Sequence, residues 1–214
     1  MKTALIIGSS GLIGTELTKQ LLQDERYNRI QVLVRTPLPF KHPKLHQVKY
    51  DFNWPDENLI QGDELYCCLG TTIKKAGSQE AFRKVDFDYI VNTATLALNK
   101  GLKKMAVVSS IAAHSESKVF YSKVKGDTEN ALKKLNFDTL IILRPSLLLG
   151  NRAELRMAEL VGAFFSTAFS FAIPDKYKAI EAKDVATCMI HQMNRAEEGQ
   201  YTLESDEIST SLKE

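Results

Sequence analysis

The stretch that decides the fold is ALIIGSSGLIGTEL, residues 4–17, close to the amino terminus. A short apolar run leads into Gly8, Gly11 and Gly14, and apolar residues at helical spacing follow. Glycines let the backbone turn sharply and approach a ligand closely, while the first amides of a helix offer donors and a positive dipole end. The spacing therefore predicts a strand, a phosphate-binding turn and a helix. A tight turn without a ligand is the alternative interpretation.

Further short apolar runs indicate strands, and segments with apolar residues three and four positions apart separate most of them. The predicted strands cover residues 4–7, 30–34, 47–50, 64–69, 105–110 and 139–144. Strands that are apolar throughout are buried on both faces, and their alternation with helices predicts a doubly wound, parallel α/β sheet of the Rossmann type. We expect a Rossmann core over residues 1–150 and a small carboxy-terminal substrate or cap lobe over residues 151–214, integrated into the same domain.

Composition narrows the classes of function. The 214 residues carry a net charge of only +2, so no strong field for nucleic acid or anionic membranes is expected. Three cysteines at no zinc-binding spacing argue against a metal site and a disulfide framework, and favour a reducing compartment such as the cytoplasm. The longest apolar stretch, residues 160–173, is too short to span a bilayer, and we expect it to be buried or to face a partner.

The second predicted strand ends at Arg35, where a site for NAD usually places an acid that holds the ribose hydroxyls. A guanidinium at this position favours a 2′-phosphate, because it makes charge-assisted hydrogen bonds. NADP is therefore preferred over NAD, and the hydroxyls of Ser9 and Ser10 could add donors to the same phosphate. A solvated charge at a strand end is the alternative for Arg35.

Four later segments, in their order along the chain, resemble the extended and atypical branches of the short-chain dehydrogenase/reductase superfamily. They are CLGTTIKKAGSQEAFRKVDFDYI (68–90), VVSS (107–110), YSKVKG (121–126) and LRPSLLLG (143–150). The first is similar to the group of Tat-interacting-protein oxidoreductases and to bacterial NAD(P)-binding relatives.

The resemblance implies a set of cofactor-binding residues in five parts of the chain. It places the pyrophosphate on the glycine turn, the adenosine phosphate at Arg35, the adenine after the third strand, and the ribose and nicotinamide beside the fourth and sixth strands. The residues are Gly8, Ser9, Ser10, Gly11, Leu12, Ile13, Gly14, Arg35, Asp51, Phe52, Leu69, Gly70, Thr71, Thr72, Arg144 and Pro145. A salt-bridged structural arginine is an equally open interpretation of Arg144.

The superfamily pattern also needs a hydroxyl at the end of the fifth strand, then Tyr-x-x-x-Lys on the next helix. Ser110, Tyr121 and Lys125 fit these roles, and Ser109 is expected to be a strand-end hydrogen bonder. Residues four apart on a helix share a face, so the lysine ammonium can favour the tyrosine anion. The asparagine that many catalytic members use in a proton relay has no defensible position, and Asn92 is not placed by the pattern.

These residues predict an NADP-dependent oxidoreductase that transfers hydride to or from a small carbonyl or alcohol substrate. Three alternatives remain open: a non-catalytic NADPH-binding redox sensor, an enzyme similar to nucleotide-sugar epimerases, and a flavin or biliverdin reductase of related fold. A homodimer is a possible assembly, since few residues follow the core to form a substrate lobe.

Overall fold

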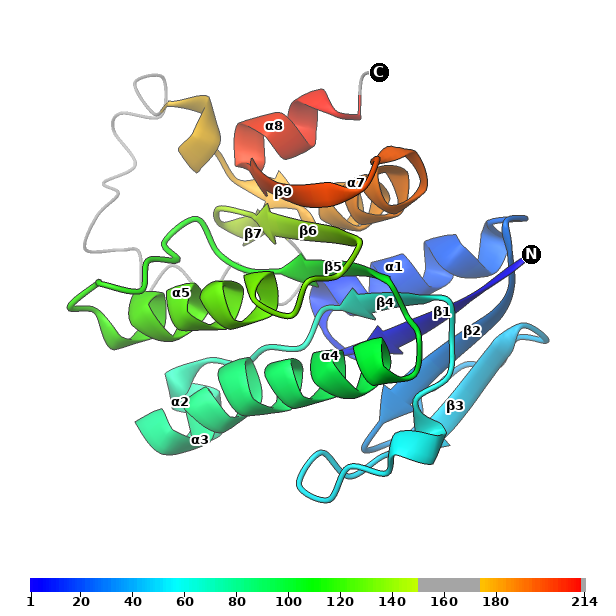
Figure 1. Ribbon diagram of the computed structural model, residues 1–214. Helices are drawn as coiled ribbons and strands as arrows, with labels where there is room; N and C mark the ends of the chain where they lie inside the picture. The colour runs from blue at the N-terminus through cyan, green and yellow to red at the C-terminus, as the bar shows by residue number, and fades with distance from the viewer. Residues whose placement is uncertain (150–173, 213–214) are drawn as a thin grey trace.

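The computed structural model describes residues 1–149 and 174–212, and its centre is a seven-stranded parallel sheet (Figure 1). The strands are β1 (Lys2–Ile7), β2 (Tyr27–Val34), β3 (Leu45–Lys49), β4 (Glu64–Cys67), β5 (Lys104–Val108), β6 (Thr139–Arg144) and β9 (Gly199–Glu204). Their order across the sheet is β3-β2-β1-β4-β5-β6-β9. The doubly wound Rossmann architecture predicted from the sequence is confirmed.

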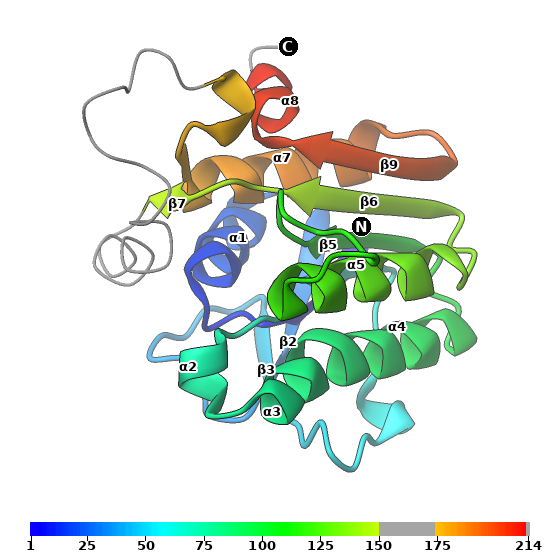
Figure 2. The same ribbon diagram turned by 90° about the vertical axis from the view of Figure 1, so that its left-hand side faces the viewer.

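Helices cover both faces of the sheet. In Figure 2, α1 (Leu12–Gln23) and α7 (Ala182–Arg195) lie on one side, and α4 (Tyr89–Asn99) and α5 (Phe120–Lys133) lie on the other. The shorter helical elements are η1 (Glu57–Leu59), α2 (Ile73–Ala76), α3 (Gln79–Arg83), η2 (Lys84–Asp88), η4 (Asp175–Tyr177) and α8 (Ser205–Thr210). A small second sheet pairs β7 (Leu148–Leu149) with β8 (Ile180–Glu181).

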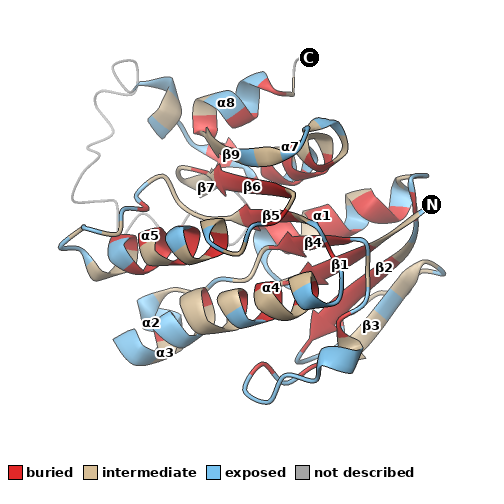
Figure 3. Ribbon diagram, in the orientation of Figure 1, coloured by how far each residue is buried: buried red, intermediate tan, exposed pale blue. Residues whose placement is uncertain are grey.

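The apolar run at the amino terminus explains why the sheet is buried on both sides. Along β1, Ala4 and Ile6 contact the core under α1 and α7, while Leu5 and Ile7 contact the core under α4. All four side chains are fully buried, and the strands are red throughout the centre of Figure 3. Burying a leucine or isoleucine side chain stabilises the fold by about 1.5–3 kcal/mol relative to leaving it exposed. A strand with apolar residues on one face only would therefore be less stable at this position.

The sheet continues beyond the core boundary predicted at residue 150. Strand β9 pairs with β6 in parallel, and α7 packs against α1, so both elements belong to the Rossmann sheet and its helical layer. The apolar stretch 160–173 lies outside the described residues. Strand β9 was missed because its side chains are mostly half-buried at the edge of the sheet, which weakens the apolar pattern.

The strand order places a crevice where ligands bind in folds of this kind. The chain moves from β1 to β2 and β3 on one side, then returns to β4, β5 and β6 on the other side of β1. At such a switch point the connections leave in opposite directions and open a space beyond the carboxyl ends of the strands. The loops that follow β1 and β4 meet at this edge.

Candidate active site and cofactor cradle

The turn after β1 is shaped by two close backbone approaches. Gly8 has a positive φ of 82°, and a Cβ atom there would lie 2.3 Å from the carbonyl carbon of Cys68. A Cβ on Gly14 would lie 2.1 Å from the Gly8 carbonyl oxygen. Side chains at these two positions would push apart the β1 turn, the β4 loop and the start of α1. Gly11 has more room, since its Cβ would be 3.4 Å from the nearest atom.

The start of α1 leaves several polar groups without partners. Gly11 is the N-cap and has no side chain, and the first turn closes with a 2.9 Å hydrogen bond from the Thr15 amide to the Gly11 carbonyl. Among the described residues, no acceptor takes the amides of Leu12, Ile13 or Gly14. Free amides at the positive end of a helix, beside a turn with no side chains, fit the pyrophosphate of a dinucleotide.

The two serines of the turn differ in exposure. Ser9 is 1% exposed, and its hydroxyl has no hydrogen-bond partner among the described residues. Ser10 is exposed beside the free amides. Of the two hydroxyls that were expected to reach a 2′-phosphate, only that of Ser10 is open to a ligand in this conformation.

Arg35 follows β2 directly and is exposed. Within the described part of the chain its guanidinium makes no ion pair and no hydrogen bond, so it is available to an anion. The residues after β3 are arranged differently. Asp51 is exposed, and its carboxylate accepts hydrogen bonds from the amide and side chain of Asn53, which lower its pKa. Phe52 is 7% exposed and belongs to the core.

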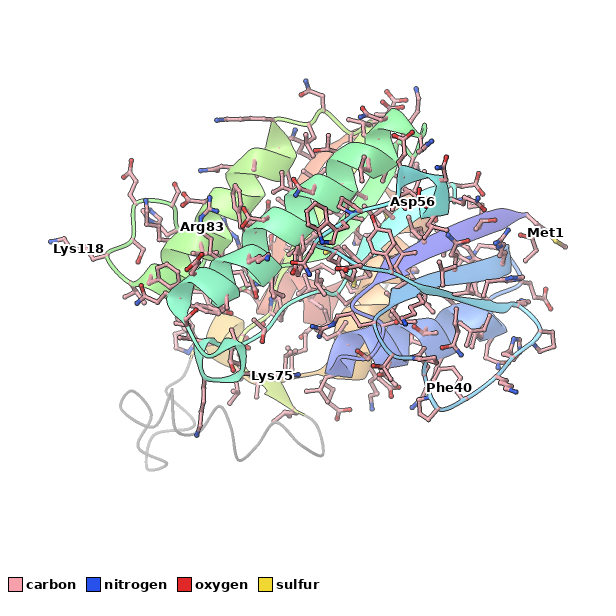
Figure 4. All side chains as sticks on the ribbon, turned by 90° about the horizontal axis from the view of Figure 1, so that it is seen from below. Met1, Phe40, Asp56, Lys75, Arg83 and Lys118 are labelled. Atoms are coloured by element: carbon pink, nitrogen blue, oxygen red, sulfur yellow. The ribbon has the colours of Figure 1, made fainter. Side chains whose placement is uncertain are left out.

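A hollow of about 640 Å³ opens beside Phe52. Its aromatic side is the Phe52 ring stacked on Tyr89, with centroids 5.3 Å apart, together with Trp54, which is 83% exposed. Arg83, labelled in Figure 4, also lines the hollow, from the end of α3. Of the two residues predicted to contact adenine, Phe52 therefore lines an aromatic hollow, and Asp51 precedes it in the chain.

The loop after β4 leads into the candidate active site. Thr72 is the N-cap of α2, and its hydroxyl accepts a hydrogen bond from the Lys75 amide at 3.1 Å. The Thr71 amide donates to a carboxylate oxygen of Asp86 at 2.9 Å. A Cβ on Gly70 would lie 3.3 Å from the other Asp86 oxygen and 3.7 Å from the Lys125 Nζ. The segment that was expected to pass under the ribose thus lies directly over an ion pair.

That ion pair joins Lys125 on α5 to Asp86 on η2. Nζ and Oδ1 are 2.8 Å apart, and the two side chains are 8% and 0% exposed. Burial lowers the pKa of Lys125, but the charge and hydrogen bonding of Asp86, together with the charges of Tyr121 and Cys67, outweigh it, and the net shift is upward. Lys125 is therefore a charged ammonium in the folded protein. The sequence does not single out Asp86, because the superfamily pattern calls for an asparagine and the acidic segment VDFD, residues 85–88, is the only local signal.

Tyr121 and Lys125 lie one turn apart on α5 and interact electrostatically. The Tyr121 ring is half-buried and contacts Phe82, with ring centroids 5.5 Å apart. Gly126, the residue after the lysine, has a role that the sequence did not reveal. A Cβ there would lie 2.2 Å from the Ser115 amide nitrogen, so the loop before α5 packs directly on the helix backbone.

The two serines at the end of β5 are used differently. Ser109 Oγ donates to Glu129 at 2.5 Å, which is the strand-end hydrogen bond that was expected. Ser110 is half-buried, and its hydroxyl has one long contact, 3.4 Å from the Ala112 amide. Ser110 therefore keeps the freer hydroxyl of the pair.

Arg144 at the end of β6 is held by carboxylates. Two of its nitrogens donate to the two oxygens of Glu129 at 3.0 and 2.6 Å, and Glu204 lies 3.9 Å away. The hydrogen bonds to Glu129 raise the pKa of Arg144. Its guanidinium therefore makes a structural ion pair, which was the alternative interpretation, and Pro145 beside it is buried. A contact of these residues with a nicotinamide stays a prediction.

No family model matches the chain. The protein HTATIP2 of Rattus norvegicus is 33% identical over 199 residues, covering 90% of this chain and 80% of that protein. The mitochondrial protein FMP52 of Eremothecium gossypii is 33% identical over 151 residues, covering 70% of this chain and 67% of that protein. Among solved structures, MoeE5 in complex with UDP-glucose and NAD has a TM-score of 0.73 at 14% identity, covering 99% of this chain and 81% of that one.

The strand order and the glycine turn define a protein of the Rossmann type. Within that type, the chain belongs to the NAD(P)-binding family, similar to atypical short-chain dehydrogenases/reductases, that includes HTATIP2 and FMP52. The MoeE5 match, at low identity, supports the fold alone.

Two further features of the described residues bear on partners. In the described ranges, no three His, Cys, Asp or Glu side chains gather as a metal site would require. No helix in those ranges is long and apolar enough to cross a membrane. The FMP52 relatives are named mitochondrial, and the compartment of this chain stays a prediction.

Proposed function

We propose that the protein is an NADP-dependent oxidoreductase that acts on a small carbonyl or alcohol substrate. The observation that supports it best is the buried ammonium of Lys125, fixed by Asp86 and placed one helical turn from Tyr121. The ammonium lies under the Gly70 backbone, at the edge of the sheet where the glycine turn leaves its amides free. A charged lysine is costly to bury unless its charge is used or paired.

The chain offers binding groups for each part of the cofactor. The amides of Leu12, Ile13 and Gly14 would hold the pyrophosphate, and the unpaired guanidinium of Arg35 would hold the 2′-phosphate. The Leu69–Thr72 backbone would line the ribose and nicotinamide. NADPH, when bound, supplies the hydride.

The side chains of the chain would manage the proton and the orientation of the substrate. Tyr121 would exchange a proton with the substrate oxygen, and Ser110, with its freer hydroxyl, would orient that oxygen. Lys125 has three N–H donors, and its ammonium forms an ion pair with Asp86 Oδ1 at 2.8 Å. Its donors would bind ribose hydroxyls, and its positive charge would lie beside the tyrosine.

The test begins with NADPH binding by the purified protein and continues with turnover across a panel of aldehydes and ketones. Tyr121→Phe should reduce turnover by about 100-fold or more, since general acid–base groups contribute about that much, while NADPH affinity stays within about twofold. Tyr177→Phe, a change at a 43% exposed tyrosine on η4, is the matched control. Turnover by Tyr121→Phe at the wild-type rate would overturn the catalytic role.

One observation favours a second candidate, an NADPH-binding sensor without turnover. The Asp86 carboxylate, 2.8 Å from Lys125, cancels much of the ammonium field that would otherwise act on Tyr121. A sensor would bind NADPH as tightly in Tyr121→Phe as in the wild type and reduce no member of the panel.

A further inference from the structure

The Asp86 carboxylate, from the turn η2, lies between the loop after β4 and helix α5. Asp86 lies in the π-helical turn η2, immediately before α4, and its side chain is fully buried. Turns of this kind insert a residue into a helix, change the direction in which the local side chains point, and are frequent at functional sites. Here the turn directs a carboxylate between the β4 loop and α5.

Two donors contact this carboxylate, one from the loop after β4 and one from α5. The Thr71 amide donates to Oδ2 at 2.9 Å, and the Lys125 ammonium lies 2.8 Å from Oδ1. Neither donor can reverse its role, because a backbone amide and an ammonium have no acceptor. The site therefore requires two acceptors on one side chain, which a carboxylate offers and an asparagine does not. An asparagine would turn its NH₂ group toward one of the two donors.

The same turn is tied to α5 a second time through the backbone. The Thr128 hydroxyl donates to the Asp86 carbonyl at 2.8 Å, and Thr128 is buried one turn after Lys125. The Asp86 backbone and side chain thus both hold α5. The Gly70 backbone closes over the ion pair, with space for a Cβ only at 3.3 Å from Oδ1.

We propose that Asp86 is a positioning residue that holds the Lys125 ammonium and the Gly70–Thr71 turn as one charged unit, so that the lysine stays protonated in the cofactor site. The expected effect on cofactor binding rests on the proposed function. The role of Asp86 in holding Lys125 and the Gly70–Thr71 turn rests on the contacts of the described residues.

The groups that face Lys125 define the expected pH behaviour. They are Asp86 from η2, Tyr121 from the same helix and Cys67 from β4. Burial lowers the pKa of Lys125, and Asp86 is the main group that raises it. In Asp86→Asn the burial remains and the opposing charge is lost, so Lys125 would release its proton at a lower pH than in the wild type.

The first experiment measures NADPH affinity against pH for the wild type, Asp86→Asn and the control Asp127→Asn. Asp127 is on α5, two residues after Lys125, but its ion pair with Lys123 is exposed and long, at 4.0 Å. We expect Asp86→Asn to bind NADPH at least tenfold more weakly and to lose affinity at lower alkaline pH, with Asp127→Asn within twofold of the wild type. A site that is merely loosened would weaken binding equally at every pH, and that result would overturn the proposal.

The second experiment needs no cofactor. Lysine labelled with ¹³C at Cε reports the protonation of Lys125 by NMR in the full chain, with Lys125→Met identifying its signal. The wild-type signal should not titrate while the protein is folded, and it should titrate in Asp86→Asn. A wild-type Lys125 that titrates like the exposed lysines would overturn the proposal, even if Asp86→Asn does not fold. Failure of the wild type to bind NADPH, with this NMR result intact, would instead overturn the proposed function.

Discussion

Removal of the Lys125 charge should destabilise the fold by an amount that the structure allows us to estimate. Lys125→Met replaces the ammonium by a side chain of similar length and leaves the fully buried Asp86 carboxylate with only the Thr71 amide as a partner among the described residues. Breaking a buried pair from one side costs about 3–5 kcal/mol, because an uncompensated charge remains in the interior. At about 2–4 °C per kcal/mol for a domain of this size, the melting temperature should fall by about 6–20 °C.

The assay is thermal and urea denaturation of the cofactor-free protein, followed by circular dichroism. Lys123→Met is the matched control, since Lys123 is on the same helix, is 54% exposed, lies 4.0 Å from Asp127 and donates an exposed hydrogen bond to the Ser115 carbonyl at 3.0 Å. Exposed contacts of this kind contribute about 1 kcal/mol or less in total, so the control should melt within about 4 °C of the wild type.

A double variant separates the charge effect from packing. Asp86→Asn/Lys125→Met removes both charges, and replacement of a buried pair by neutral groups is often close to neutral in stability. We therefore expect the double variant to be more stable than Lys125→Met alone. The reasoning fails if Lys125→Met melts together with the Lys123→Met control, since the buried carboxylate would then not depend on its partner.

Three further predictions concern other parts of the molecule. Arg35→Leu should weaken NADPH binding about tenfold or more and leave NADH binding unchanged in fluorescence titrations; an equal loss for both would refute a role at the 2′-phosphate. Gly8→Ala should lower the melting temperature severely or prevent folding, because of its positive φ and the 2.3 Å approach to Cys68, whereas Gly11→Ala should fold. Burial raises the pKa of the Cys67 thiol from 9.0 to about 12, so the unfolded chain releases that proton first and stability falls as pH rises across this range. Urea midpoints should fall less steeply with pH in Cys67→Ala; equal slopes would contradict this.

Much of the fold could be read from local patterns. The six predicted strands are all present, and Thr139–Arg144 matches its predicted run residue for residue. Strand β9 and the cap of α7 could not be read in this way. The position of Asp184 near the amino end of the helical segment AIEAKDVATCMIHQM, residues 179–193, predicts that it caps this helix. The prediction is wrong, because α7 begins at Ala182 with Glu181 as its N-cap and Asp184 lies in the first turn. Edge strands and helix starts depend on a few half-buried residues, whose pattern is weak.

The sequence by itself determined the order of the strands and helices and the glycine turn between β1 and α1. These depend on residues that are neighbours in the chain, since apolar periodicity and the absence of a Cβ act locally. It also determined that Tyr121 and Lys125 share a helix face, because spacing alone decides that.

Only the tertiary structure decided which side chains those residues meet. Lys125 pairs with Asp86, Ser109 with Glu129, and Arg144 with the same glutamate, and each pair joins separate elements. The physical reason is that a buried charge or hydrogen-bond donor costs free energy unless a partner lies within about 3 Å, and the packing of the elements decides which group is that partner. The π-helical turn η2 places Asp86 beside Lys125. No local sequence pattern predicts the change in side-chain direction that this turn produces.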